Sequence, residues 1–210
     1  MKQLIFIGAP GSGKGTQSEW FVAKKQYKHI STGDLLRSEI SSGTELGLKV
    51  KSIMDKGNLV SDEIVLQLLE ANCDLKKNVY IFDGYPRTLS QAKTLVSNFL
   101  CHADYKAIYF KLEKDFLLQR LTNRRSCSQC GMIYNLVFSP PKIANHCDKC
   151  GFSPLVHRKD DTEEVIRNRF EVFEATVGPV ISFFKELGRL VEVDASMAAE
   201  SVYQDILQKI

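Results

Sequence analysis

The stretch "GAPGSGKGT" at residues 8–16 constrains the fold more than any other part of the sequence. It follows the apolar run "LIFI" and leads into residues that favour a helix. A glycine-rich turn between a strand and a helix can surround a phosphate with backbone N–H groups, because glycine reaches positive φ and lets the backbone come close. The positive end of the helix and the Lys14 ammonium add to this attraction. The sequence therefore predicts a phosphate-binding loop in an α/β fold, with a merely tight turn as the alternative.

One position departs from the general pattern G-x-x-x-x-G-K-[ST], in which a hydroxyl follows the lysine and binds Mg²⁺. Gly15 stands at that position, and Thr16 comes one residue late. We therefore expect nucleotide oxygens and water to hold the metal. Asp83 ends the strand-like run "VYIFD" and is the expected orienting carboxylate, because the carboxyl ends of parallel strands face the ligand crevice and Mg²⁺ keeps much of its hydration shell. Capping of the following turn is the alternative role for Asp83.

Short β-branched or aromatic runs alternate with amphipathic stretches along the chain. Their nearly continuous apolar character is expected of parallel strands that are covered on both faces. Ser61 and Thr162, each followed by two acidic residues, are predicted to begin helices, and Gly188 is predicted to end one. The predicted fold class is α/β, a P-loop parallel five-stranded sheet flanked by helices. The expected strands are residues 3–7, 79–83, 107–112 and 190–194, with a briefer fifth at 28–31.

Two segments interrupt this alternation. Residues 31–60 form a helical stretch without a strand, and residues 123–160 hold four cysteines and two adjacent prolines without a long periodic pattern. Each segment is flanked by ordinary α/β elements, so each is predicted to be an insert in a single core. The expected core comprises residues 1–30, 61–122 and 161–210.

The second insert carries the motifs "CSQC" and "CDKC", separated by sixteen residues. This spacing is typical of a four-cysteine zinc site, and four thiolates fill a tetrahedral shell, so the metal is expected to be structural. A disulfide or free thiols are one alternative, and replacement of one ligand by His146 is another. The two remaining cysteines, Cys73 and Cys101, are expected to be small buried hydrophobes. The predicted Zn²⁺ ligands are Cys127, Cys130, Cys147 and Cys150.

The overall composition excludes several classes of protein. A net charge of +3 is too small to indicate a nucleic-acid partner. No apolar run approaches the roughly 20 residues that span a bilayer, so no membrane partner is expected. The N-terminus leads into strand-like residues without a signal-peptide pattern, which favours the cytoplasm, where cysteines stay reduced. The expected helices show no surplus apolar stripe, so we expect a monomer.

A series of motifs in register resembles the adenylate kinase family of nucleoside monophosphate kinases. The long 123–160 insert resembles the large lid of bacterial members, some of which bind a metal there. The resemblance implies reversible, Mg²⁺-dependent transfer of the terminal phosphoryl group of ATP to AMP, giving two ADP, by direct in-line transfer under a closing lid, in adenine nucleotide homeostasis. The motifs are "GAPGSGKGTQ", "STGDLLR" (31–37), "GNLV" (57–60), "FDGYPRT" (82–88) with Gln91, "NRR" (123–125) and "RKDD" (158–161) with Arg169.

The resemblance also implies roles for individual residues. Lys14 would hold ATP phosphates, Arg37 and Arg87 would hold the AMP phosphate, and further arginines would close around the transferring group. The implied catalytic set is Lys14, Asp83, Arg87, Arg124, Arg158 and Arg169. The implied ATP contacts are Gly11, Ser12, Gly13, Lys14, Gly15, Thr16, Arg120, Arg124, Ile133, Tyr134 and Met197, with the base against residues 195–197. The implied AMP contacts, many of them in the 31–60 insert, are Thr32, Arg37, Asn58, Leu59, Val60, Gly84, Tyr85, Pro86, Arg87, Gln91, Arg158 and Arg169.

The chemistry suits these residues, because the attacking phosphate oxygen is already anionic near pH 7 and needs no general base. Catalysis would rest on positioning and on positive charge around the transferring group. Another monophosphate acceptor is the main alternative, although Gln91 and the long lid favour AMP. A GTPase or ATPase switch would need a hydroxyl at position 15, and a zinc-ribbon nucleic-acid binder would need a basic stripe that "IYNLVFSPPK" lacks.

Overall fold

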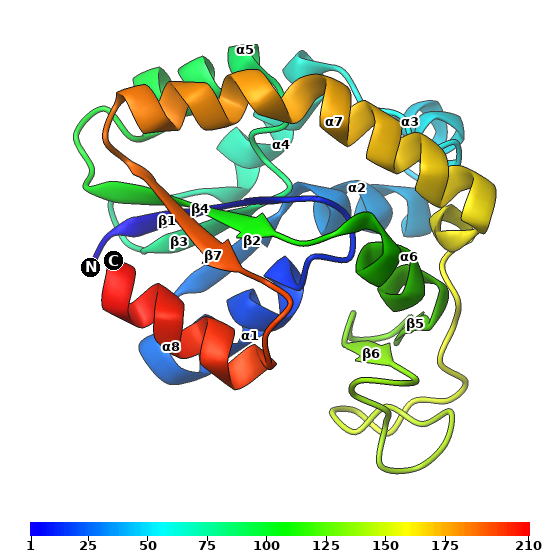
Figure 1. Cartoon of the computed structure of the whole chain (residues 1–210). Coiled ribbons are helices and arrows are strands. Elements are labelled where there is room, and N and C mark those ends of the chain that lie inside the picture. Colours follow the sequence, from blue (N-terminus) through cyan, green and yellow to red (C-terminus); the bar gives the residue numbers. More distant parts are fainter.

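The computed structural model describes all 210 residues and contains one five-stranded parallel sheet with helices on both faces (Figure 1). All five predicted strands are present, and the predicted α/β fold class is confirmed. The strand order along the sheet is β2-β3-β1-β4-β7, so the strand before the phosphate loop lies at the centre. The strands are β1 (Gln3–Gly8), β2 (Lys28–Ser31), β3 (Tyr80–Asp83), β4 (Tyr105–Lys111) and β7 (Leu190–Asp194).

Eight α-helices surround the sheet. Helices α1 and α8 cover one face, and α4, α5 and α7 cover the other (Figure 1). No helix combines the length and the apolar character that a bilayer crossing requires. The helices are α1 (Lys14–Lys25), α2 (Thr32–Ser41), α3 (Glu45–Asp55), α4 (Asp62–Asn72), α5 (Leu89–Thr94), α6 (Lys114–Thr122), α7 (Glu163–Glu186) and α8 (Ala199–Lys209), with a π-turn at Leu95–Phe99 and a 3₁₀ turn, η2, at Lys159–Asp161.

The two faces of β1 show why the central strands are continuously apolar. Leu4 and Phe6 pack into the cluster under α1 and α8, whereas Ile5 and Ile7 pack into the larger cluster under α4, α5 and α7. Successive side chains of a strand point to opposite faces, so a strand covered on both sides must be apolar at every position. This burial fixes β1, and the loop that follows it, in the middle of the molecule.

The predicted helix boundaries hold, but two caps differ in detail. Ser61 and Thr162 occupy the N-cap positions of α4 and α7, yet neither side chain accepts a hydrogen bond from the first turn. Acidic residues in those first turns remain to balance the positive end of each helix dipole. Gly188 follows α7 with a φ of 65° and donates its N–H to the Lys185 carbonyl, as expected of a terminating glycine.

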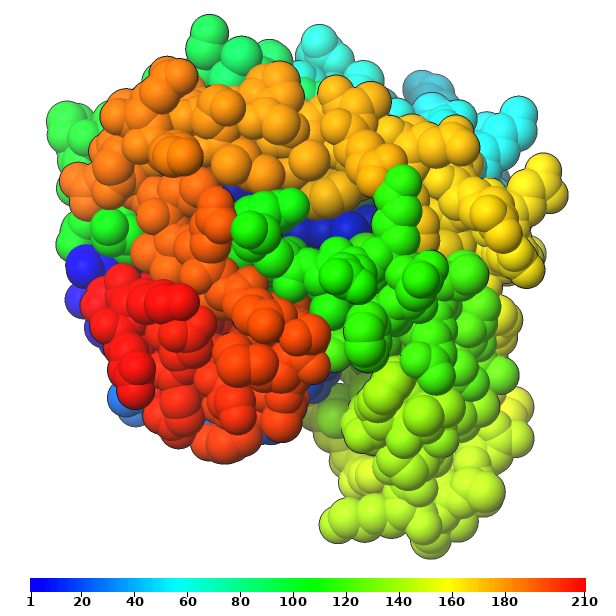
Figure 2. Space-filling model, viewed as in Figure 1, coloured from blue at the N-terminus to red at the C-terminus, as the bar shows by residue number.

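The two segments that interrupt the alternation lie on either side of α7's N-terminal end. From Thr32 to Val60 the chain forms α2 and α3 and no strand. The segment after α6 projects from the main body (Figure 2) and contains the antiparallel pair β5 (Arg124–Ser126) and β6 (Ile133–Asn135). This projecting segment has a small core of its own, made of Cys127, Tyr134, Cys147 and Leu155.

Candidate active site

The phosphate loop lies at the carboxyl end of β1, where the sequence predicted it. Gly11 has a φ of 82° and Gly13 a φ of 93°, a region that side-chain-bearing residues rarely adopt. A Cβ on Gly11 would also lie 3.0 Å from Leu121 Cγ and 3.2 Å from the Leu117 carbonyl oxygen, both of α6. Helix α6 therefore packs directly on the loop and holds its backbone in place.

The Lys14 ammonium is held inside this loop. Its Nζ donates hydrogen bonds to the carbonyl oxygens of Gly8 (2.7 Å) and Ala9 (3.0 Å), and to Ser12 Oγ (3.3 Å). Burial lowers the pKa of Lys14 to about 8, although the Asp83 carboxylate opposes this shift. An anion bound in the loop would favour the charged ammonium, so the loop is suited to a phosphate.

Gly15 lies in the first turn of α1 and faces the projecting segment. A Cβ at Gly15 would lie 3.6 Å from Ile133 Cδ1, which is an ordinary van der Waals contact, and the backbone there is helical. A side chain at position 15 would therefore fit this arrangement. The absence of the hydroxyl that binds Mg²⁺ in the general pattern is not imposed by crowding.

Asp83 ends β3 beside the phosphate loop and is bound to a histidine that sequence reasoning missed. His29 Nε2, on the neighbouring strand β2, lies 3.2 Å from Asp83 Oδ2. Burial raises the pKa of the Asp83 carboxyl, but the His29 hydrogen bond and the Lys14 charge outweigh it and lower the pKa. Burial likewise opposes protonation of His29, but its bond to Asp83 raises the pKa of the imidazole. The carboxylate is therefore ionised and fixed in position.

Two carboxylates of the η2 turn organise the arginines of the site. Asp161 is only 1% exposed and accepts two hydrogen bonds from Arg124, Nε to Oδ2 at 2.7 Å and Nη2 to Oδ1 at 2.5 Å. Arg169 Nη1 donates to Asp161 Oδ1 (3.1 Å) and to Asp160 Oδ2 (2.9 Å). Sequence reasoning assigned no role to these two aspartates. Their signal was available in the motif "RKDD", because cations gathered in a partly buried site need counter-charges.

The buried arginines are strongly desolvated. Burial lowers the pKa of Arg158 to about 9, and the neighbouring charges of Arg124 and Arg37 add to this effect. Burial lowers the pKa of Arg169 to about 10, against the opposing effect of Asp160. A polyanion placed among these guanidinium groups would relieve their mutual repulsion, so this part of the molecule attracts phosphates.

A pocket beside this cluster brings together most of the residues predicted to contact AMP. Thr32 Oγ1 and Arg87 Nε both donate to the Gly84 carbonyl oxygen at 2.9 Å. Gln91 accepts from the Arg87 N–H (2.7 Å) and donates to Asp62 Oδ1 (2.7 Å). Of the predicted AMP contacts, nine line the pocket: Thr32, Arg37, Asn58, Leu59, Val60, Gly84, Arg87, Gln91 and Arg169.

Three residues predicted to contact AMP do not line this pocket, namely Tyr85, Pro86 and Arg158. Tyr85 is 1% exposed and packs in the larger core cluster. The Tyr85 side chain therefore anchors the turn between β3 and α5 in the hydrophobic core. Any contact of these three residues with AMP stays a prediction.

The predicted ATP-base region gathers around Arg120. Its Nη2 donates to the Ala195 carbonyl oxygen (3.1 Å), and its guanidinium carbon lies 5.8 Å from the ring centroid of Phe138, which sequence reasoning missed. Tyr134 points elsewhere, because it is 4% exposed and its hydroxyl lies 3.5 Å from Cys147 Sγ. A contact of Tyr134 with ATP stays a prediction, and its side chain belongs to the core of the projecting segment.

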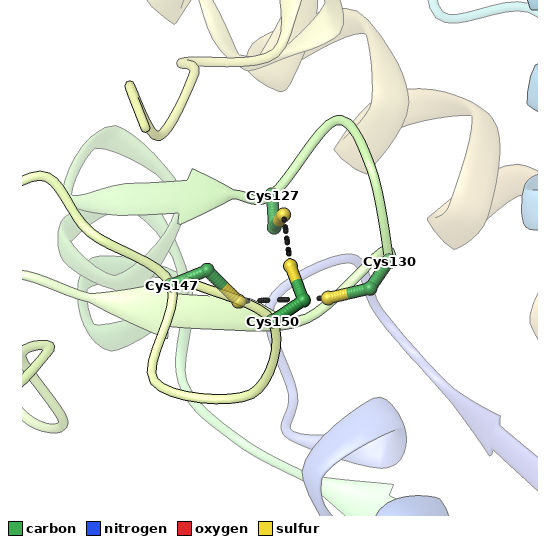
Figure 3. Close-up of side chains that lie close together, drawn as sticks. All are labelled: Cys127, Cys130, Cys147 and Cys150. Atoms are coloured by element: carbon green, nitrogen blue, oxygen red, sulfur yellow. Dashed lines mark hydrogen bonds between the residues drawn. The ribbon is translucent and has the colours of Figure 1, made fainter. Parts of the chain in front are cut away.

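The four cysteines of the projecting segment point their sulfur atoms at one another (Figure 3). All four Sγ atoms lie within 4.8 Å of one another, and the Cys127–Cys150 and Cys130–Cys147 pairs are 3.5 Å apart. Tetrahedral coordination with metal–sulfur bonds of about 2.3 Å places neighbouring sulfurs about 3.8 Å apart. The soft thiol donors and their spacing therefore fit one tetrahedral metal ion.

Two alternatives for the cysteines, a disulfide and a histidine ligand, are not supported. No disulfide joins any of the six cysteines, so the disulfide alternative is wrong. His146 Nδ1 lies 2.9 Å from the Ala144 carbonyl oxygen, and the ring is not part of the sulfur cluster. The prediction that Cys101 is buried is also wrong, because it is exposed, while Cys73 is half-buried.

The sequence is similar to those of known proteins over nearly the whole chain. A family model described as adenylate kinase matches residues 6–189. The chain is 42% identical to a protein named adenylate kinase from Thermosipho melanesiensis, over 99% of this chain and 98% of the relative. It is 40% identical to one from Clostridium perfringens, over 97% of this chain and 96% of the relative, and 41% identical to one from Archaeoglobus fulgidus, over 99% and 98%. The chain therefore belongs to the adenylate kinase family.

Proposed function

We propose that this protein catalyses reversible transfer of the terminal phosphoryl group of ATP to AMP, giving two ADP, and so contributes to adenine nucleotide homeostasis. The observation that carries the proposal is the convergence of cations at the carboxyl end of the sheet. Arg87, Arg124 and Arg169 lie close enough to Lys14 that all three charges lower the pKa of its ammonium. A phosphoryl group passing between two bound nucleotides needs such a cluster, because charge spreads over its oxygens in the transition state.

Each cation acts by holding phosphate rather than by moving a proton. We assign Lys14 and the loop N–H groups to the ATP phosphates, and Arg37 and Arg87 to the phosphate of AMP. Arg124, Arg158 and Arg169 would then surround the transferring group and hold donor and acceptor oxygens in line. The attacking phosphate oxygen is already anionic, so this direct transfer needs no general base.

Magnesium enters with ATP, as is usual for adenylate kinases, and Asp83 is the residue that fits it. The ion, when bound, neutralises phosphate charge and orients the oxygens of the transferring group. Asp83 is ionised and nearly buried, and His29 fixes it through Oδ2. The other carboxylate oxygen, Oδ1, would accept hydrogen bonds from water molecules around a cation. Gly15 offers no oxygen from its side chain, which supports the assignment of this task to Asp83.

Lid closure is the second part of the proposal. The core would comprise residues 1–30, 61–122 and 161–210, with 31–60 as the AMP-binding insert and 123–160 as a metal-bound lid. The separate small core of the projecting segment supports this division, and bending is expected near residues 122–125 and 158–162. We assign the protein to the cytoplasm, since thiol ligands persist in a reducing compartment. We also propose that it is a monomer.

The adenine of ATP is assigned to the space between the projecting segment and the loop after β7. Arg120 supports this assignment, because it contacts the Ala195 carbonyl and faces the Phe138 ring. A flat, electron-rich base can stack on both a guanidinium plane and an aromatic face. Ile133, which approaches Gly15, and Met197 would border the same space.

The choice of acceptor tests the proposed function. In a coupled assay with ATP as donor, we expect kcat/KM for AMP to exceed the values for GMP, CMP and UMP by about 10²-fold or more. The reason is that a polar pocket rejects a base whose donors and acceptors it leaves unpaired. Comparable values for AMP and another monophosphate would favour the alternative, a kinase for a different acceptor.

Zinc is the metal that we propose for the lid, in a structural role. Purified protein is expected to contain about one equivalent of zinc, and stripping it with a chelator should lower the melting temperature by about 10 °C. Activity well below the new melting temperature should survive in part, because four thiolates leave no open position for chemistry. The matched control is Cys73→Ser, outside the cluster, which should keep the metal. Absence of bound metal, or complete loss of activity with the fold intact, would contradict a structural zinc site.

A further inference from the structure

The turn that ends α3 is completed by a side chain from another helix. Gly57 has a φ of 80°, its N–H bonds the Met54 carbonyl (2.9 Å), and the Asn58 N–H bonds the Ile53 carbonyl (3.1 Å). This pair of bonds is the Schellman arrangement of a helix C-terminus. It leaves the carbonyl of Lys56 without a partner inside the helix, since the last carbonyls of any helix need partners from outside.

Asn168 of α7 supplies the missing partner. Its Nδ2 donates to the Lys56 carbonyl oxygen at 2.8 Å and to Asn58 Oδ1 at 2.9 Å. A side-chain amide nitrogen carries two hydrogens, so both are used and both acceptors belong to the same turn. Asn168 therefore holds the turn against α7 by two hydrogen bonds. Their acceptors, on Lys56 and Asn58, are 112 and 110 residues away in the chain.

Close packing of Gly57 against α7 accompanies these two hydrogen bonds. A Cβ at Gly57 would lie 2.7 Å from Arg169 Cγ, closer than real Cβ atoms approach other atoms, and 3.0 Å from Val165 Cγ1, which is tighter than most real contacts. The turn thus rests directly on α7, against Val165 and Arg169, which lie three residues before and one residue after Asn168. The position of Asn58 relative to Arg169 is fixed by this contact and by the two hydrogen bonds.

This turn forms one wall of the acceptor pocket, whereas Asn168 does not line the pocket itself. Gly57, Asn58, Leu59, Val60 and Arg169 all line the pocket. We propose that Asn168 is a positioning residue for the acceptor nucleotide: it fixes the wall formed by residues 57–60 against the arginine that meets the phosphate. This inference rests on the assignment of the pocket to AMP.

The most informative variant is Asn168→Asp. It keeps the size of the side chain but replaces the amide donor by a carboxylate oxygen, which would repel the two acceptor oxygens. We expect KM for AMP to rise about threefold to tenfold in Asn168→Ala, the range that one or two lost hydrogen bonds support, and further in Asn168→Asp. KM for ATP should stay within about twofold of the wild-type value, because none of the phosphate-loop residues 8–16 lines the pocket that this turn borders. The matched control is Arg167→Ala, whose side chain pairs with Glu163 on the exposed side of the same helix.

A double-mutant cycle separates positioning from a general loss of stability. Asn58→Ala removes one of the two acceptors, so Asn58→Ala and Asn168→Ala combined should raise KM for AMP by less than the product of the single effects. All assays are run well below each variant's melting temperature. An equal rise in the KM values of both nucleotides would indicate a structural role and overturn the proposal.

Arg37→Ala distinguishes failure of this proposal from failure of the pocket assignment, because Arg37 lines the pocket directly. If Arg37→Ala raises KM for AMP while the Asn168 variants leave it unchanged, the positioning role is wrong and the pocket assignment stands. If none of these variants changes KM for AMP, the assignment of the pocket fails and the proposal fails with it.

Discussion

Replacing Lys14 with methionine is expected to lower kcat/KM for ATP by about 10³-fold or more while the protein stays folded. Methionine keeps an unbranched chain of similar length but removes the charge that meets the ATP phosphates. The loop can adapt to this loss, because the Nζ only bonds the Gly8 and Ala9 carbonyls and Ser12 Oγ, groups that water can also satisfy. A buried cation held this way costs stability, so Lys14→Met should be at least as stable as the wild type.

The measurement is steady-state kinetics with circular dichroism on the same samples. Lys25→Met is the matched control, because Lys25 is an exposed residue in the last turn of the same helix. It should leave kcat/KM unchanged. A Lys14→Met enzyme within tenfold of the wild type would show that the loop binds phosphate through its backbone alone, and would remove Lys14 from the catalytic set.

The pH dependence of ATP binding provides an independent check on Lys14. Burial lowers the pKa of Lys14 from 10.5 to about 8, so in the free protein the ammonium loses its charge as the pH rises above 8. Bound ATP favours the charged form, so the KM for ATP should be steady from pH 7 to 8 and should rise by up to about tenfold per pH unit above that. In Lys14→Arg this rise should begin at a higher pH, because a guanidinium holds its proton more strongly than an ammonium in the same place.

Much of the fold follows from short-range patterns in the sequence. The runs at 3–7 and 107–112 are predictable as strands because burial on both faces demands apolar residues at every position, as the packing of Leu4 and Ile5 on opposite faces shows. The phosphate loop and the cysteine pairs are predictable for a related reason. In each, the residues that would bind one ion or one phosphate stand in short motifs, so their spacing records the geometry.

The contacts that escaped prediction join residues far apart in the chain. Asp83 and His29 are 54 residues apart, and Asp161 and Arg124 are 37 residues apart. Neither pair has a local pattern, because each depends on which strands become neighbours and on how α7 crosses the sheet. The orientation of Tyr134 is a similar case. Its neighbours Arg125 and Ile133 do not reveal that its hydroxyl lies among the cysteines, since that depends on how the whole projecting segment closes on itself.

Asp161 is the missed residue with the largest expected effect on stability. Its carboxylate is 1% exposed and lies between the side chains of Arg124 and Arg169, which are 13% and 14% exposed. Asp161→Asn keeps the shape but leaves two nearly buried guanidinium groups without their shared counter-charge. We expect the free energy of unfolding to fall by about 3–5 kcal/mol, which corresponds to a melting temperature lower by about 10 °C. Asp160→Asn is the matched control and should cost less, because Asp160 contacts only Arg169 among these arginines.

The nucleotides themselves should repair part of this defect, which distinguishes a charge effect from simple loss of packing. ATP and AMP together, without magnesium so that no turnover occurs, would place phosphate charge beside the unpaired guanidinium groups. A ligand that binds only the folded state raises the melting temperature more, the more tightly it binds. The unpaired guanidinium groups of Asp161→Asn should bind the phosphates more tightly, so nucleotides should raise its melting temperature more than that of the wild type. Differential scanning calorimetry with and without the nucleotides measures both shifts. Equal shifts in the two proteins would mean that Asp161 supports the fold without balancing the charges that meet the phosphates, and that the arginines keep their places by packing alone.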